Sequence, residues 1–143
     1  MRVRDVLSRK GAAVATISPG STVASVAAAL AQHRVGALVV SSDGSGIEGI
    51  ISERDLVRGL DTYGADLLQM PVGEIMTADV HTCGLGDEVS ELARIMTDKR
   101  FRHMPVAVDG VLSGIVTIGD IVKIRLDELE TEHEQLIGYI SSG

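Results

Sequence analysis

The chain has 143 residues and a net charge of −7, and aromatic residues make up only 2% of it. The acidic charge argues against binding to a nucleic-acid backbone, and the scarcity of aromatics argues against base stacking; neither excludes a local basic pocket. The single cysteine, Cys83, excludes an internal disulfide bond and a cysteine-based metal cluster.

Hydrophobic residues make up 45% of the chain, so a sizeable aliphatic core can form, in one domain or in two halves of about 70 residues. The N-terminal residues lack the apolar stretch of a signal peptide, and the longest apolar runs are far shorter than a membrane span. We therefore expect a cytoplasmic protein with no membrane partner and no nucleic-acid partner.

The first half of the chain is predicted to fold as β-α-β-β-α after a short lead-in helix. Ser21 follows a Pro-Gly break and can cap the first long helix, whose apolar positions recur with a 3.6-residue period. Asp61–Pro71 is the predicted linker to the second half. In chain order, the expected elements are a lead-in helix at Val3–Leu7, a strand at Val14–Ile17, a helix from Ser21 to Gln32, strands at Ala37–Val40 and Ile47–Ile51, and a helix at Glu53–Leu60.

The second half repeats this order, with Asp87 as the expected cap of its first long helix. We predict an α/β (α+β) fold in which two β-α-β-β-α repeats pack as a pseudo-two-fold pair, with domains at 1–65 and 66–125 and a helical extension at 126–143. The expected elements are a lead-in helix at Val72–Met76, strands at Val80–Cys83, Val106–Val108 and Leu112–Thr117, and a last helix from about Gly119.

The last helix is predicted to continue to about Ile140. Apolar residues spaced alternately four and three apart form a heptad seam with one polar member, His133. The seam covers under three heptads, too short for a coiled coil that stands alone. We expect it to dock on a partner or on a second copy of the chain; packing back onto its own domain is the alternative. The seam consists of Val122, Leu126, Leu129, His133, Leu136 and Ile140.

A short signature occurs twice, at Gly49–Val57 and Gly114–Val122, offset by 65 residues. In each copy a glycine and two β-branched apolar residues precede a hydroxyl residue, and an aspartate follows three residues later. A duplicated hydroxyl and carboxylate behind an apolar strand predict two related polar clefts, and so a ligand. The signature hydroxyl and carboxylate residues are Ser52 and Asp55 in the first copy and Thr117 and Asp120 in the second.

The duplicated order of elements, the Gly-apolar-apolar-Ser/Thr-x-x-Asp signature and the Arg102–Val106 segment together resemble a tandem pair of cystathionine-β-synthase-type (CBS) domains. The resemblance covers Val3 to about Arg125. The chain also resembles small bacterial proteins that contain only such a pair, so we expect no appended enzyme. The resemblance implies regulatory binding of an adenosine-containing ligand (AMP, ADP, ATP, S-adenosylmethionine or NAD(H)) in two clefts, and a disc-like homodimer.

An adenosine ligand needs a carboxylate for its ribose diol, hydroxyls, N–H groups or a helix N-terminus for phosphate, and an apolar slot for its base. In the family, each cleft joins the signature of one half to the other half's first strand and second-strand start. Carried onto this chain, cleft one would join Thr117, Gly119 and Asp120 with Thr16, Val35, Gly36 and Ala37. Cleft two would join Ser52, Arg54 and Asp55 with Thr82, Phe101, Arg102 and His103.

The two clefts differ in charge. Cleft two has Arg102 and His103 where related proteins place phosphate-contacting basic residues, whereas cleft one has Gly36 and Ala37 there. We therefore expect phosphate preference in cleft two. Cleft one would bind the adenosine part of a ligand, or a phosphate with help from Arg34 or a second subunit.

Each of these contacts also has a purely structural alternative. The two signature carboxylates lie in the first turn of a helix, where negative charge is favourable without a ligand, and the two hydroxyls can cap those helices. Arg102 can form a surface ion pair, and His103 can be a buried hydrogen-bonded residue. Cys83 fits a small core residue better than a redox sensor, since the sequence shows no basic neighbour to activate it.

The leading hypothesis is a non-catalytic sensor that acts through a homodimer on an unidentified regulated protein, with no required cofactor and no metal. A ligand would switch the dimer only if it binds one arrangement better than another. An enzyme is disfavoured because the sequence offers no nucleophile–base set, no Gly-x-x-x-x-Gly-Lys phosphate loop and no paired catalytic carboxylates. The alternative is a protein-interaction adaptor with degenerate ligand sites.

Overall fold

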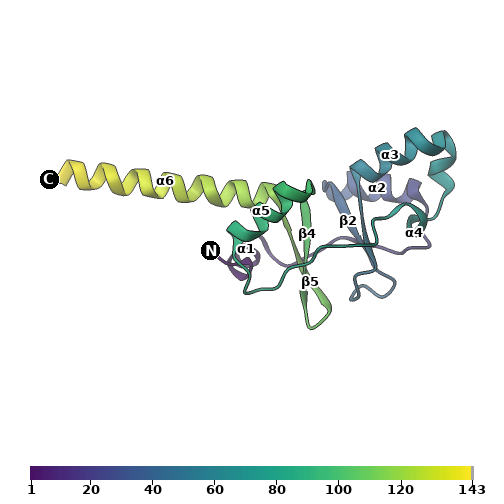
Figure 1. Ribbon diagram of the computed structural model, residues 1–143, viewed down its shortest axis with the longest axis horizontal. Helices are drawn as coiled ribbons and strands as arrows, with labels where there is room; N and C mark the ends of the chain where they lie inside the picture. The colour runs from purple at the N-terminus through teal and green to yellow at the C-terminus, as the bar shows by residue number, and fades with distance from the viewer. Residues whose placement is uncertain (143) are drawn as a thin grey trace.

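The computed structural model describes residues 1–142 of the chain. Two halves lie side by side, and each contains a small group of strands. The long helices of both halves lie on the same side of these strands (Figure 1). The predicted mixed α/β fold of two repeats with a long C-terminal helix is confirmed.

The first half forms a three-stranded sheet in the order β1-β2-β3, in which β1 pairs parallel and β3 antiparallel to β2. All four residues of β2 are buried, as expected for a central strand under a helix. Thr22, one residue after the predicted cap Ser21, is the N-cap of α2, and its oxygen accepts the Ser25 N–H. The elements are β1 (Thr16–Ile17), α2 (Val23–His33), β2 (Ala37–Val40), β3 (Gly49–Ser52) and α3 (Glu53–Tyr63).

The second half has a two-stranded antiparallel sheet of β4 and β5, preceded and followed in the chain by a long helix. Glu88, rather than the predicted Asp87, occupies the N-cap position of α5, while the Asp87 carboxylate accepts the Gly84 N–H at 2.8 Å. The elements are α5 (Val89–Lys99), β4 (His103–Val108), β5 (Val111–Thr117) and α6 (Ile118–Ser142).

The strand predicted at Val80–Cys83 is wrong, because only Cys83 pairs, as an isolated parallel bridge to Val106. In the first half, the N–H of Val39 donates to the carbonyl of Ala15 and so extends the pairing of β1 with β2. The repeat aligns Val39 with Pro105, which has no N–H to donate. Proline therefore explains why the counterpart of β1 in the second half is reduced to the single bridge at Cys83.

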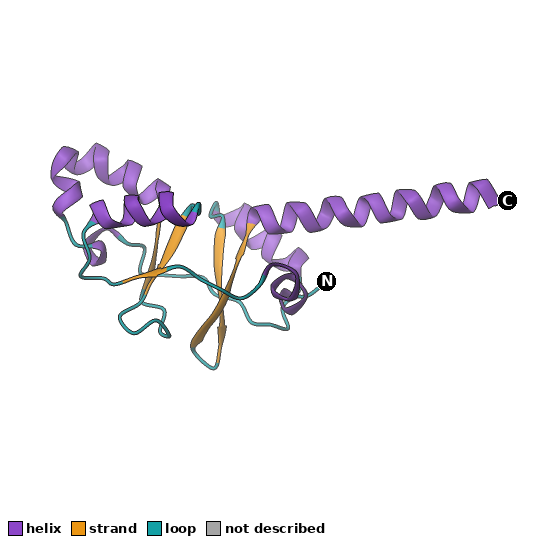
Figure 2. Cartoon of the chain, turned by 180° about the vertical axis from the view of Figure 1, so that it is seen from behind, coloured by secondary structure: helices purple, strands orange, loops and turns teal. Residues whose placement is uncertain are grey.

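The short lead-in helices are exchanged between the halves. Helix α1 (Val3–Lys10) contributes Val3, Val6 and Leu7 to the core of the second half, and α4 (Val72–Ile75) contributes Val72 to the core of the first. Figure 2 shows the N-terminal helix on the same half as the long C-terminal helix. The boundaries predicted at residues 65 and 125 divide the sequence repeats. They do not divide the cores, because each core includes a helix from the other repeat.

Each signature begins with a glycine because the exchanged segment lies against it. A Cβ on Gly49 would lie 2.9 Å from the carbonyl oxygen of Thr77 and would clash with the Met76 side chain. A Cβ on Gly114 would lie 2.7 Å from Cδ1 of Leu7. At each repeated glycine, a strand of one half therefore packs closely against the exchanged lead-in segment of the other repeat.

The predicted linker Asp61–Pro71 is in large part ordered structure. Helix α3 continues to Tyr63, and a 3₁₀ helix, η1 (Gly64–Gln69), follows directly. Leu67 of η1 is 1% exposed, and its side chain occupies the space that a Cβ on Gly59 would need. One buried leucine thus fixes the end of the first half.

Helix α6 has two parts. Its first turns belong to the core of the second half through Ile121 and Ile124, while every residue from Leu129 to Ser142 is exposed. Figure 1 shows this second part projecting beyond the body of the molecule. Within the described chain, the alternative that the seam packs back onto its own domain is therefore wrong.

We expect Gly49→Ala to lower the free energy of unfolding by about 1–3 kcal/mol, because the added methyl group meets backbone that cannot rotate away. Chemical denaturation measures the change. Gly20→Ala is the matched control, since a Cβ there has no neighbour within 4 Å in the described chain. Equal stability of the two variants would contradict the close approach at Gly49.

Candidate functional site

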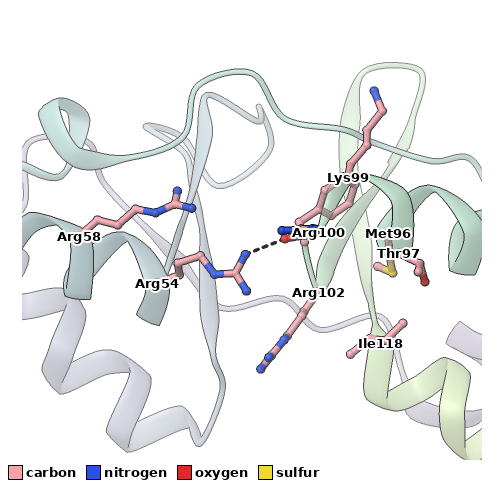
Figure 3. A pocket seen from close by; sticks show the side chains of 9 residues that line it. Arg54, Arg58, Met96, Thr97, Lys99, Arg100, Arg102 and Ile118 are labelled. Carbon is pink, nitrogen blue, oxygen red and sulfur yellow. Dashed lines mark hydrogen bonds between the residues drawn. The ribbon is translucent and has the colours of Figure 1, made fainter.

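A pocket of about 660 Å³ lies between α3 of the first half and the α5–β4 junction of the second. Figure 3 shows the Arg54 and Arg58 side chains extending from α3 toward the other half, and Arg102 extending toward the same gap. The basic pocket, as we call it, is lined by Arg54, Arg58, Met96, Thr97, Lys99, Arg100, Phe101, Arg102 and Ile118.

The lining is strongly cationic although the chain is acidic. Five of its nine residues are arginine or lysine, and the lining contains no carboxylate within residues 1–142. The whole chain carries 20 acidic and 13 basic residues, so this concentration runs against the average composition. A concave site of one charge sign focuses its potential, and a ligand with phosphate or another anionic group is the chemistry that it favours.

Local structure holds the cations in place. Arg54 and Arg58 are one turn apart on α3 and therefore share a face. Lys99 and Arg100 lie at the C-terminal end of α5, where positive charge is favourable, and Arg100 ends the helix in the left-handed conformation with φ 59°. The Arg54 guanidinium donates to the Arg100 carbonyl at 2.7 Å, so one hydrogen bond joins the two halves across the pocket.

An aromatic pair borders the basic pocket. The ring of Phe101 stacks on His81 with centroids 5.3 Å apart and planes 13° apart. His81 Nε2 lies 3.2 Å from the ammonium nitrogen of Lys99. The neighbouring Thr82, which the sequence assigns to cleft two, is exposed.

The signature carboxylate of the first half is held by hydroxyls. Asp55 accepts the N–H of Ser52 at 2.8 Å and the Ser52 hydroxyl at 3.1 Å on one oxygen. Its other oxygen accepts the hydroxyl of Thr77 at 3.2 Å. Ser52 occupies the N-cap of α3 as foreseen, Asp55 completes a capping box with it, and Thr77 reaches them from the segment that follows α4.

The signature carboxylate of the second half is held by a cation. Asp120 accepts the Thr117 N–H at 2.9 Å and forms a 2.7 Å ion pair with Lys10, whose ammonium also donates to the Ile115 carbonyl. Burial alone would raise the pKa of Asp120, but the bonds from Lys10 and Thr117 outweigh it and hold the pKa below the ordinary 3.8. Lys10 belongs to the exchanged helix α1, which sequence patterns did not place here.

His103 lies between the two proposed clefts. A Cβ on Gly36 would be 3.3 Å from Cε1 of the His103 ring and 3.4 Å from Oε1 of Glu53. Burial lowers the pKa of His103, with a smaller contribution in the same direction from Arg102 that Glu53 opposes, so the ring is neutral at pH 7. His103 is therefore a largely buried ring that lies close to Gly36 of the other half.

Three residues assigned to cleft two, Arg54, Phe101 and Arg102, line one pocket, and they come from both halves as the crosswise arrangement requires. Ser52 and Asp55 lie beside that pocket in the cap of α3 rather than in its lining. Of the residues assigned to cleft one, Thr16, Val35 and Gly119 are exposed, Ala37 is buried in β2, and Gly36, Thr117 and Asp120 are partly buried.

Sequence reasoning missed three cations that line the basic pocket and one, Lys10, that pairs with Asp120. Arg58 follows Arg54 at the helical spacing of four, so the periodicity of α3 carried a signal for it. Lys99 and Arg100 directly precede Phe101 in the chain. Lys10 could be placed only once the exchange of α1 was known.

Cys83 is a core residue, as predicted from its neighbours. Burial raises its pKa to about 12, with a smaller contribution from Asp87, so the thiol is unreactive at neutral pH. Within residues 1–142, no cluster of three His, Cys, Asp or Glu side chains is arranged to hold a metal ion. None of the helices in the described part of the chain is both long and apolar enough to cross a bilayer.

The fold and the paired signatures define a class of protein, a tandem pair of α/β repeats with polar sites where the two repeats meet. The chain belongs to the CBS domain family, whose pattern matches residues 3–62 and 72–127. The resemblance seen in the sequence is therefore confirmed over both halves.

Two relatives cover most of the chain. The crystal structure of the CBS-domain protein ATU1752 from Agrobacterium tumefaciens is 43% identical with a TM-score of 0.84, and the match covers 87% of this chain and 99% of that one. The mitochondrial CBS domain-containing protein CBSX3 of Arabidopsis thaliana is 34% identical over 99% of this chain and 72% of its own length.

Two further solved structures contain adenosine compounds. The CBS domain pair of protein MJ0100, in complex with 5′-methylthioadenosine and S-adenosyl-L-methionine, is 25% identical with a TM-score of 0.78, covering 90% of this chain and 98% of that one. The CBS domain protein PAE2072 of Pyrobaculum aerophilum, complexed with AMP, is 27% identical with a TM-score of 0.72, covering 84% and 89%. Structural relatives of this chain thus bind AMP or S-adenosylmethionine.

We expect Lys10→Met to lower the free energy of unfolding by about 1 kcal/mol at neutral pH, because it removes the cation paired with Asp120. The pKa of Asp120 is lowered in the folded protein, so this stabilisation is full above the unfolded value of 3.8 and is lost as the pH falls through the lower folded value. Denaturation at a series of pH values measures the difference between variant and wild type. Arg9→Met, which removes an exposed pair with Asp127, is the control and should change little.

Proposed function

We propose that this protein is a non-catalytic regulatory module that binds an adenosine-containing ligand through the basic pocket and acts as a homodimer. The observation that carries the proposal is the cluster of five cations, drawn from both halves, in a chain of net charge −7. AMP in one structural relative and S-adenosylmethionine in another support adenosine as the shared part of the ligand.

The pocket chemistry favours a phosphorylated adenosine compound over S-adenosylmethionine, whose sulfonium is positively charged. Arg54, Arg58 and Arg102 would bind the phosphate groups through charge-assisted hydrogen bonds. The stacked ring of Phe101 borders the same pocket and provides an apolar surface for the base. AMP, ADP, ATP and NAD(H) all fit this chemistry, and AMP or ATP is our first choice.

In this proposal Asp55 binds the ribose diol beside the pocket. Ser52 and Thr77 orient the carboxylate, and the oxygen that accepts only the Thr77 hydroxyl retains a lone pair to accept a ribose hydroxyl. Cleft one is expected to bind more weakly, because a ribose there must compete with the ion pair of Lys10 and Asp120. The same Lys10 would supply a phosphate contact, the role that the sequence suggested for Arg34.

The bond between Arg54 and Arg100 gives binding a route to a change in shape. The hydrogen bond from Arg54 to the Arg100 carbonyl links α3 directly to α5. A phosphate that accepts a hydrogen bond from Arg54 would compete with that carbonyl. The ligand then favours the arrangement of the halves in which this link is weakened, as a population shift requires. The regulated protein partner would read that change, and a cytoplasmic location remains our expectation beside a mitochondrial relative.

A second candidate is an adaptor whose ligand sites are degenerate. The observation that favours it is that both signature carboxylates already have partners within the chain, Asp55 with Thr77 and Asp120 with Lys10. Under this candidate the pocket cations serve only to join the halves, and adenosine compounds do not bind.

We expect one or more of AMP, ADP, ATP, NAD⁺ and NADH to raise the melting temperature, and Arg58→Gln and Arg102→Gln each to weaken binding about tenfold, as loss of one charged hydrogen bond implies. Thermal shift ranks the ligands, and isothermal titration calorimetry gives the affinities. S-adenosylmethionine belongs in the same series and should bind more weakly.

Arg94→Gln is the matched control, because Arg94 lies on α5 outside the pocket, exposed and paired with Glu91. It should bind ligand as the wild type does. Binding that is unchanged in all three arginine variants would reject the basic pocket as the phosphate site. No binding by the wild type would favour the adaptor.

A further inference from the structure

A heptad seam runs along the exposed side of α6. Its five apolar members are between 44% and 68% exposed, and the line continues from the folded body to the projecting end of the helix. Large apolar side chains exposed in one contiguous line mark an interaction surface. The apolar members are Val122, Leu126, Leu129, Leu136 and Ile140, and the polar member His133 lies between Leu129 and Leu136.

The seam and the core-facing side of α6 are different faces of the helix. Ile124 is buried in the core of the second half, while Val122 is exposed. At about 100° per residue, Leu126 and Leu129 fall within about 40° of Val122, and Ile124 lies about 160° away. A second helix can therefore pack along the seam, because the folded body of the second half contacts the opposite face of α6.

The charges beside the seam favour a second copy of the same helix in parallel orientation. With Leu126 at position a and Leu129 at position d, Arg125 occupies position g and Glu130 the following position e. In a parallel pair, Arg125 of each copy faces Glu130 of the other, which gives two attractive contacts. The polar His133 occupies an a position, where one polar residue typically fixes register and strand number.

Other occupants fit less well. The antiparallel register that aligns the same apolar residues brings Glu130 against Glu130 and Glu132 against Glu132 of the second copy, which repel. Residues 127–142 carry five carboxylates and no lysine or arginine, whereas helices that lie on membranes are rich in those cations.

We infer that α6 pairs with α6 of a second copy as a short parallel coiled coil along Val122–Ile140. The seam is under three heptads long, but α6 is already started and fixed by Ile121 and Ile124 in the core, so the cost of nucleating a helix is met within each chain. This pairing specifies a contact for the homodimer of the proposed function, and it rests on the proposed function only for the dimeric state. The ligand pocket lies elsewhere and takes no part.

Disulfide formation between introduced cysteines tests this register. In a parallel pair the two copies of residue 136 face each other at a d layer, at a separation that a disulfide can span. We expect Leu136→Cys to form a disulfide-linked dimer under mild oxidation, seen by non-reducing electrophoresis. Gln135→Cys, one residue away on the outward face, is the matched control and should form little. Cys83 is buried, and burial raises its pKa, so it does not contribute.

A second substitution shows whether the cross-link depends on the seam. Adding Leu129→Glu to Leu136→Cys should reduce the cross-linked fraction to that of Gln135→Cys, while Thr131→Glu, on the outer face, should leave it high. Both residues are exposed, so neither change disturbs a core. Absence of the Leu136→Cys dimer, or equal cross-linking of Gln135→Cys, overturns the proposal. So does a mixed disulfide between Leu126→Cys and Leu136→Cys chains, which only the antiparallel register produces.

Ligand titration of the Leu129→Glu chain separates the two proposals. Adenosine-ligand binding depends on the basic pocket, so its absence in the wild type rejects the proposed function without affecting the cross-link. Loss of the cross-link with ligand binding intact rejects helix pairing alone. His133→Leu adds a positive arm, because replacing the polar layer by an apolar one should lower the dissociation constant of the dimer at least tenfold, measured by sedimentation.

Discussion

The exchange of two short helices between the halves is the constraint on which the rest of the molecule depends. Each half has a small sheet, too few strands to bury its own apolar face, and each is completed by a helix that precedes the other half in the chain. Val3 and Val72 are both fully buried in the half to which they do not belong by sequence. The cores are therefore stabilised together, and the basic pocket lies where the two halves meet.

The same exchange makes the two signature sites unlike in charge. The segment after α4 brings the hydroxyl of Thr77 to Asp55, and the end of α1 brings the ammonium of Lys10 to Asp120. Asp55 is hydrogen-bonded only by N–H and hydroxyl groups and keeps its full negative charge, whereas the charge of Asp120 is paired with a cation within the chain. The cationic lining around Arg54 adds to this difference, since it gathers on the side of the hydroxyl-bound carboxylate.

Sequence reasoning reached the fold through its repeated patterns and failed where single residues override a pattern. The helical period and the alignment of the copies placed α2, α5 and β2 to within a few residues. Pro105 removed a strand that the alignment had implied, and Leu67 turned a linker into packed structure. For the site, the pattern pointed to Arg54, Phe101 and Arg102, but Lys10 is set by tertiary exchange, which leaves no local periodicity.

The exchange also bears on how such a chain can originate. A single repeat, with its lead-in helix reaching outward, could complete its core only by trading that helix with another molecule, and would exist as a swapped dimer. Joining two repeats in one chain turns the trade into an intramolecular event at high effective concentration. From then on the two helices are free to diverge, so one can end in Lys10 and the other lead to Thr77. Covalent duplication thus allows the two signature carboxylates of one chain to have different partners.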